Sequence, residues 1–123
     1  MNQPLILIVE DERLIARDIA TQLHELGYRT VGPATTGEKA IEMAQSLRPQ
    51  LVLMDVHLAS TMDGITAAQT IRDQFDIPSL FLSAFDAGHS LERAERTQPV
   101  GFLVKPFLDS ELQDAVAAAF KQR

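Results

Sequence analysis

Five residues that could take part in one reaction lie at the ends of apolar runs that are far apart in this sequence. Glu10 and Asp11 follow the first run, and Asp55 closes the second. Ser83 ends the third run, and Lys105 follows the last. If these runs are parallel strands of one sheet, the carboxylates, the hydroxyl and the ammonium meet at one edge. Together they are the groups needed for a magnesium-assisted phosphoryl transfer.

The composition indicates an ordinary globular domain and excludes several kinds of site. The chain has 123 residues, 46% hydrophobic and 23% charged, which fits one domain with its own core. Its formal net charge of -6 argues against a surface that binds DNA or a membrane. The lack of cysteine excludes disulfides, thiolate metal sites and cysteine nucleophiles. The first residues lack the basic segment of a signal peptide, so we expect a cytoplasmic protein.

Short apolar runs predict the strands that position these residues. Continuous rather than alternating apolar character is typical of strands covered on both faces. Four such runs occupy residues 4–10, 51–55, 79–83 and 101–104. A weaker run at residues 30–32 predicts a fifth strand.

Apolar residues at helical spacing fill the gaps between the runs. Four stripes join Ile15 to Leu26, Ala40 to Leu47, Ile65 to Phe75 and Leu112 to Phe120. A glycine or a proline follows the first three as a stop signal. Capping-box spacings, Thr35 to Glu38 and Ser110 to Gln113, precede the second and the last. The segment at about 88–97 gives the weakest pattern, with Leu91 and Ala94 inward and its charged residues outward.

Strands that alternate with helices predict an α/β domain, a doubly wound parallel sheet with helices on both faces. In such a sheet the ligand site lies beyond the carboxyl ends of the strands, at the switch in strand order. Every polar residue named above stands at such an end. No linker or repeat divides the chain, so we expect residues 1–123 to form a single domain.

The chain resembles the receiver domains of two-component response regulators from about residue 4 to residue 121. The residues that carry the resemblance are Glu10-Asp11, Asp55, Asp63-Gly64, Ser83 and Phe102 to Phe107. None of these motifs is specific alone, but their joint order and spacing is. The resemblance implies a flavodoxin-like sheet with the strand order 2-1-3-4-5.

The resemblance implies that Asp55 is the phosphoacceptor and that Mg²⁺ is the cofactor. Asp11 and Asp55 would bind the ion directly, Glu10 mostly through water, and the backbone carbonyl of His57 would complete the protein ligands. Clustered carboxylates repel one another, so the three acids need either a cation among them or raised pKa values. Taken alone, Asp55 reads better as a strand-end residue that caps a loop, and the alternative for Glu10-Asp11-Glu12 is a first-turn acidic cluster that faces the helix dipole.

The remaining site residues also gain their roles from the resemblance. Lys105 would pair with phosphoryl oxygens, aimed by a cis bond to Pro106. Ser83 would donate its hydroxyl to the phosphoryl group and serve, with Phe102, as a switch residue. Phe102 lacks the hydroxyl of the tyrosine common at this position, and it reads equally well as ordinary core. Without the others, Ser83 and Lys105 would be a backbone-bonded serine and a solvated strand end.

Several positions depart from the family's pattern. The loop from Val56 to Gly64 lacks a common proline and is one residue longer than the commonest form. Residues 98–101 lack the acidic residues of receivers that dimerise through their last two helices. The His57 side chain either tunes hydrolysis of the phosphoryl group or is simply solvated. Phe85 is a candidate shield of that group against water.

These observations predict a phosphoacceptor receiver rather than an enzyme with turnover of its own. Its partners would be a histidine kinase or a histidine phosphotransfer protein and a downstream effector, with no direct contact to nucleic acid or membrane. One alternative is a receiver-like interaction module that is not phosphorylated. A less favoured one is a magnesium-dependent phosphatase with Asp55 as nucleophile. Such enzymes generally need a second acid two residues on, where this chain has His57.

Overall fold

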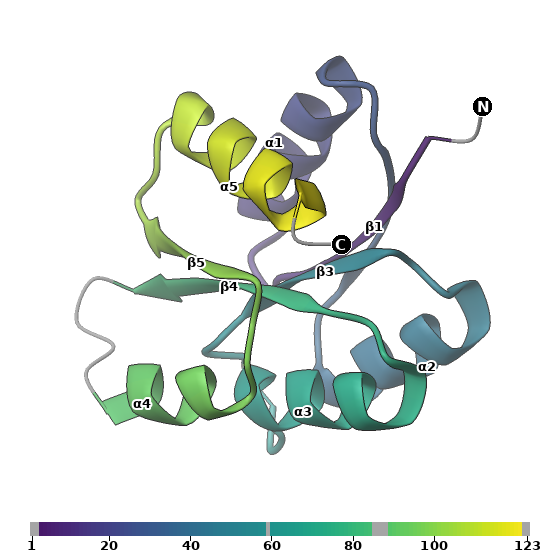
Figure 1. Cartoon of the computed structure of the whole chain (residues 1–123), viewed down its shortest axis with the longest axis vertical. Coiled ribbons are helices and arrows are strands. Elements are labelled where there is room, and N and C mark those ends of the chain that lie inside the picture. The colour runs from purple at the N-terminus through teal and green to yellow at the C-terminus, as the bar shows by residue number, and fades with distance from the viewer. Residues whose placement is uncertain (1–2, 59, 85–88, 122–123) are drawn as a thin grey trace.

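The computed structural model describes residues 3–58, 60–84 and 89–121. In these residues five strands alternate with five helices (Figure 1). The strands are β1 Leu5–Val9, β2 Arg29–Ala34, β3 Leu51–Asp55, β4 Ser79–Ala84 and β5 Gly101–Lys105. The helices are α1 Arg13–Glu25, α2 Gly37–Leu47, α3 Gly64–Phe75, α4 His89–Arg96 and α5 Asp109–Lys121. None of the described helices is long and apolar enough to cross a membrane.

The strands form one parallel sheet in the order β2-β1-β3-β4-β5. Helices α1 and α5 cover one face, and α2, α3 and α4 cover the other (Figure 1). The predicted doubly wound α/β fold and its strand order are therefore confirmed. Because all strands run the same way, their carboxyl ends lie along a single edge.

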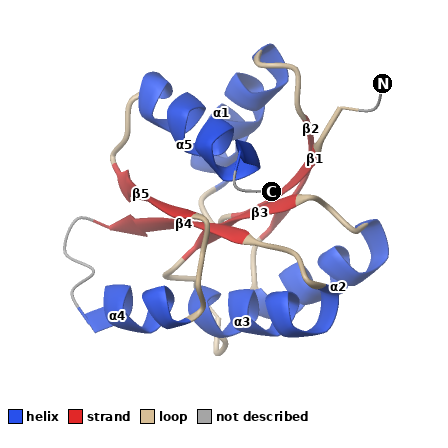
Figure 2. Cartoon of the chain, in the orientation of Figure 1, coloured by secondary structure: helices blue, strands red, loops and turns tan. Residues whose placement is uncertain are grey.

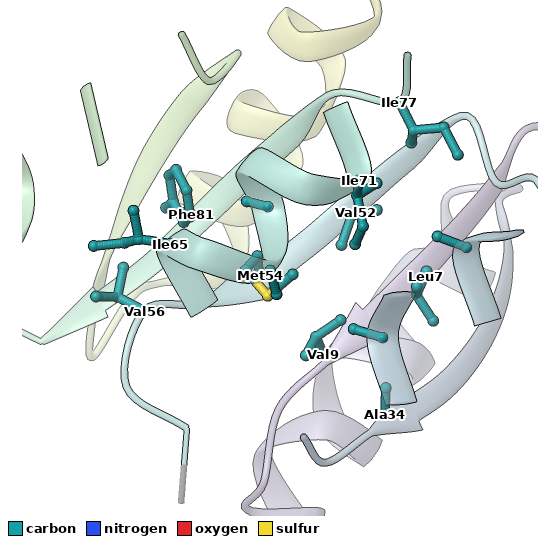
Figure 3. Packing of buried hydrophobic residues seen from close by; sticks show 14 of the residues in the cluster. Leu7, Val9, Ala34, Val52, Met54, Val56, Ile65, Ile71, Ile77 and Phe81 are labelled. Atoms are coloured by element: carbon teal, nitrogen blue, oxygen red, sulfur yellow. The ribbon is translucent and has the colours of Figure 1, made fainter. Parts of the chain in front are cut away.

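Two hydrophobic clusters, one on each face of the sheet, hold the layers together. On the larger side, Val52, Met54 and Phe81 of the central strands pack toward Ile65 and Ile71 of α3 (Figure 3). Strands β1 and β3 are buried along almost their whole length, which explains their continuous apolar sequences. Neighbouring residues of one strand thus enter opposite cores.

Strand β2 is longer than the predicted residues 30–32. It continues through Gly32 and Pro33 to Ala34, and its register against β1 shifts between Leu7 and Val9. Glycine and proline are disfavoured inside central strands but accepted at bulges and on edge strands. Because β2 lies at the edge, it tolerates Gly32 and Pro33, and these two residues weakened the strand pattern in the sequence.

Two predicted capping boxes are wrong by one or two residues. Helix α2 is capped by Thr36, whose hydroxyl accepts the Lys39 N–H at 3.1 Å, so the pair Thr35 and Glu38 is not the cap. At α5, the carboxylate of Glu111 accepts the N–H of Leu108 at 2.8 Å. That bond forms one half of a capping box without a side-chain cap before it.

The predicted stop of α1 at Gly27 is confirmed. Gly27 has a φ of 93°, a left-handed conformation that costs glycine little, and its N–H bonds the His24 carbonyl. The weak segment at about 88–97 does form a helix, α4.

Candidate functional site

The site lies at the carboxyl edge of the sheet, where three strands deliver the predicted charged residues (Figure 2). Glu10 and Asp11 follow β1, Asp55 is the last residue of β3, and Lys105 is the last of β5. Strands β1 and β3 are neighbours at the centre of the sheet, so their acids meet directly. Lys105 comes from the edge strand and must reach across β4 to join them.

Lys105 makes that reach and bonds two carboxylates at once. Its Nζ lies 2.6 Å from Glu10 Oε1 and 3.0 Å from Asp55 Oδ2. The Lys105–Pro106 peptide bond is cis, as the resemblance implied. Partial burial lowers the pKa of Lys105, but the bonds to Glu10 and Asp55 outweigh it, so the pKa is raised. The lysine is therefore a fixed positive charge at neutral pH.

The acids form a tight cluster on this lysine. One carboxylate oxygen from each of Glu10, Asp11 and Asp55 lies within 4.8 Å of the others. Glu10 is completely buried, and burial raises its pKa from an ordinary 4.5 to about 7. Bonds from Lys105 and the Glu12 N–H lower that pKa, but only in part, and the neighbouring Asp55 raises it further. One ammonium thus does not balance the negative charge gathered here.

The donor set fits a hard divalent cation. Oxygen is the only ligand type offered by Glu10, Asp11 and Asp55, and Mg²⁺ prefers oxygen ligands. Three carboxylates meet a single ammonium here, and burial makes the charged form of Glu10 unfavourable, as its raised pKa reflects, so a cation beside it would stabilise that charge. Asp11 and Asp55 would hold the ion, with Glu10 beside them.

The backbone around Asp55 is fixed by contacts from its own loop. The His57 N–H donates to Asp55 Oδ1 at 3.0 Å. The Gly64 N–H donates to the Val56 carbonyl at 3.1 Å. A Cβ atom on Gly64 would lie only 1.8 Å from the Asp55 carbonyl oxygen. Glycine is therefore required at position 64 by close approach, a reason that the Asp-Gly motif alone did not reveal.

The predicted switch residues lie on the neighbouring strands. Ser83 is buried and donates its hydroxyl to the Ala84 carbonyl at 3.2 Å, on the strand directly beside Asp55. Phe102 is half-buried and stacks on Phe81, with ring centroids 5.8 Å apart. Both readings of Phe102 therefore remain compatible with its position. The predicted metal contact of the His57 carbonyl stays a prediction, and Phe85 lies outside the described residues.

Comparison with known proteins assigns the family. The family model described as "Response regulator receiver domain" matches residues 6–117. The chain belongs to the response regulator receiver family. A signal receiver domain of a modulated diguanylate cyclase from Desulfovibrio desulfuricans G20 superposes with a TM-score of 0.91 at 33% identity. That match covers 98% of this chain and 96% of that chain.

Curated relatives of this receiver domain are longer regulators. The transcriptional regulatory protein PdtaR of Mycobacterium tuberculosis is 42% identical over 114 residues, which are 93% of this chain and 55% of that protein. The phyllosphere-induced regulator PhyR of Methylorubrum extorquens is 33% identical over 115 residues, 93% of this chain and 42% of that protein. The chain thus spans about half the length of these relatives or less.

One contact of this receiver domain was not anticipated from the sequence. Arg93, placed by its periodicity on the outer face of α4, bonds the carboxylate of Asp63 at 2.8 Å. Asp63 also caps α3 by accepting the Thr66 N–H at 2.8 Å. No spacing rule predicts an ion pair between residues 30 positions apart on different elements.

The pKa of Glu10 predicts how the metal-free stability of the receiver domain depends on pH. The unfolded chain releases this proton near 4.5, but the folded chain does so only near 7. This contribution to stability is therefore complete below pH 4.5 and is lost as pH rises through about 7. Each pKa unit corresponds to about 1.4 kcal/mol, so the loss amounts to a few kcal/mol at most. Mg²⁺ should offset it, and most strongly above pH 7.

Thermal melts from pH 5 to 8.5, in chelator and in Mg²⁺, measure this effect. We expect Tm to fall with rising pH in chelator, to fall less in Mg²⁺, and the slope to flatten in Glu10→Gln. Glu12→Gln is the control, because it removes an exposed carboxylate two residues away. Equal slopes for Glu10→Gln and the wild type would contradict the assignment of this dependence to Glu10.

Proposed function

We propose that this receiver domain takes a phosphoryl group onto Asp55, with Mg²⁺, from the phosphohistidine of a histidine kinase or phosphotransfer protein. The modified state then changes a surface that an effector protein or domain recognises. The observation that carries the proposal is the convergence of three carboxylates and one ammonium from distant strands. This set differs from a chance cluster because Lys105 holds the proposed nucleophile directly.

The chemistry assigned to each residue follows from its contacts. A carboxylate oxygen of Asp55 attacks phosphorus as the bond from phosphorus to the donor histidine nitrogen breaks, and the imidazole leaves with the bonding electrons. The product is a mixed anhydride on Asp55. Lys105 already touches Asp55 Oδ2, so it is in place to bond a phosphoryl oxygen. Mg²⁺ bound at the acids supplies further positive charge to the transferred group.

The response to the new charge is assigned to Ser83 and Phe102. The Ser83 hydroxyl now bonds the neighbouring Ala84 carbonyl, and it would exchange that partner for a phosphoryl oxygen. Phe102 has no hydroxyl, so only packing, including its stack on Phe81, would drive its movement. The chain is proposed to be no enzyme beyond transfer to itself and slow loss of the phosphoryl group. A cytoplasmic setting, without direct binding of nucleic acid or membrane, belongs to the same proposal.

Acetyl phosphate tests the proposal without knowledge of the natural donor. With Mg²⁺ the intact mass should rise by one phosphoryl group, and with chelator it should not. Peptide mapping should place the group on the peptide that contains Asp55. A chain that takes no phosphoryl group would favour the unmodified interaction module. Steady release of phosphate from a small phosphate ester would favour a phosphatase.

A candidate docking groove for the phosphodonor lies beside Lys105. It has a volume of about 530 Å³ and is lined by Leu14, Ile15, Asp18, Ala84, Lys105, Pro106 and Phe107. Leu14 on α1 is 81% exposed, and Leu108, which follows the lining residue Phe107 in the chain, is 68% exposed. Exposed apolar side chains that cluster beside a reactive site mark a protein-binding surface. The proposed occupant is the helical surface that presents the phosphohistidine.

Replacing Leu14 with glutamate should slow transfer from a phosphohistidine protein by about fivefold or more, because a contact of this kind contributes more than about 1 kcal/mol. Labelling by acetyl phosphate should not change, since Leu14 belongs to no part of the acid cluster. The control is Leu47→Glu, at an exposed leucine of α2 on the opposite face of the sheet. Equal slowing by both variants, or slowing with acetyl phosphate too, would remove the groove from the proposal.

A further inference from the structure

Helix α4 has little apolar attachment to the rest of the domain. Among its described side chains, Ala94 is the one that is fully buried, and Leu91 is half-buried. The charged residues Glu92, Arg93, Glu95 and Arg96 are exposed. The helix lies beside α3 on the lower face of the sheet in Figure 1. An element with so few buried apolar groups opens locally more easily than the core does.

Two arginines hold α4 to α3, one at each end. Arg72 of α3 donates to the carbonyls of Thr97, at 3.3 Å, and Gln98, just beyond the last turn of α4. Arg93 of α4 donates in the opposite direction, to Asp63 Oδ2 at 2.8 Å. The position of α4 therefore depends on polar contacts rather than on a large core.

The contact at Asp63 leads to the proposed phosphoacceptor. Asp63 is the N-cap of α3, and Gly64 after it lies against the Asp55 carbonyl. The Gly64 N–H also bonds the carbonyl of Val56, the residue next to Asp55. A displacement of the Asp55 backbone would therefore be passed to Gly64 and Asp63 through these direct contacts.

We propose that the Arg93–Asp63 ion pair holds α4 in its unphosphorylated position and makes Arg93 the positioning residue through which α4 senses the state of Asp55. The inference rests on the proposed function. A hydrogen bond weakens when its angle or length departs from the ideal, so a shift at Asp63 would weaken this contact and with it the attachment of α4 to α3. Arg93 also lines a groove of about 300 Å³ between α3 and α4, together with Arg96 and Thr70.

The ion pair is partly exposed, which sets the size of the expected effect. The side chains of Arg93 and Asp63 are 50% and 36% exposed. Pairs at such exposure change an equilibrium by about two- to fivefold. The scarcity of buried apolar groups on α4 makes a change of this size measurable there, whereas it would disappear in the core.

Hydrogen exchange of the unphosphorylated chain tests whether the Arg93–Asp63 ion pair holds α4. We expect Arg93→Gln to speed exchange of the amides at 89–97 about two- to fivefold and Arg93→Lys to restore part of the protection. Asp63→Asn should match Arg93→Gln, because asparagine keeps the cap on α3 but loses the charge. The double variant should add little to either single one. Arg96→Gln is the control, since it removes the same charge from the same groove without breaking this pair.

Exchange after treatment with acetyl phosphate and Mg²⁺ tests the sensing role. In the wild type, phosphorylation should speed hydrogen exchange in α4. In Arg93→Gln, phosphorylation should increase the exchange rate of α4 by a smaller factor. An equal gain in both, or Arg93→Gln behaving like Arg96→Gln, overturns the proposal. If the wild type takes no phosphoryl group, the proposed function and the sensing role fail together. Hydrogen exchange of the unphosphorylated variants would still decide whether the Arg93–Asp63 ion pair holds α4.

Discussion

Replacing Asp55 with asparagine is expected to abolish phosphoryl uptake from acetyl phosphate. An amide is not a nucleophile toward phosphorus, yet it has the shape of the carboxylate and keeps an oxygen that can accept the His57 N–H. The fold should persist, because the change removes one of two carboxylates that share Lys105. Intact mass spectrometry before and after treatment measures the result.

Asp63→Asn is the matched control for that experiment. It removes a carboxylate from the same loop that is not part of the acid cluster, so labelling should continue. A phosphoryl group that persists on Asp55→Asn would place the acceptor on another residue. Loss of labelling in Asp63→Asn as well would show that the whole loop, and not one nucleophile, had been disturbed.

Replacing Gly64 with alanine is expected to lower the free energy of unfolding by about 3 kcal/mol, at the upper end of the cost of overpacking. Intrinsic helix propensity favours alanine over glycine by about 1 kcal/mol and predicts the opposite sign. The clash prevails because the added methyl would lie 1.8 Å from the Asp55 carbonyl oxygen, and backbone cannot rotate aside. Since that carbonyl belongs to the acceptor, labelling by acetyl phosphate should slow as well.

Gly37→Ala provides the comparison, because Gly37 is likewise the first residue of a helix after its N-cap. There the nearest atoms are Cγ and Sδ of Met62, at 2.9 Å, in a flexible side chain that can move. We expect a change within about 1 kcal/mol of zero. Denaturant titration of both variants measures the difference. Similar values for the two would mean that the Asp55 backbone yields to the methyl group.

The sequence predicted the fold and the acids because both depend on local signals. The apolar runs before Glu10 and Asp55 are continuous since β1 and β3 are buried on both faces, and parallel strands must bring their ends, including that of β5 before Lys105, to one edge. Glycine and proline obscured only β2, which lies at the edge. The capping residues were misplaced by one or two positions because several Ser, Thr and Glu residues compete near each helix start.

Pairings across the fold were beyond sequence reasoning. Lys105 was expected to pair with phosphoryl oxygens, but in the unmodified chain it already bonds Glu10 and Asp55 and neutralises part of their charge. Arg93 was assigned to solvent because its helical position faces outward, and only the placement of α4 beside α3 brings it to Asp63. Such contacts depend on the relative position of elements, which periodicity does not encode.

The interrupted register of β2 limits how copies of this chain can associate. A regular edge strand presents unpaired N–H and C=O groups with which another strand can pair, and a bulge with a proline disrupts that pattern. The shift at Gly32 and Pro33 leaves only a short regular stretch on the β2 side. The other margin, β5, pairs only with β4 and has Val104 exposed. Backbone pairing between copies along β2 is therefore disfavoured.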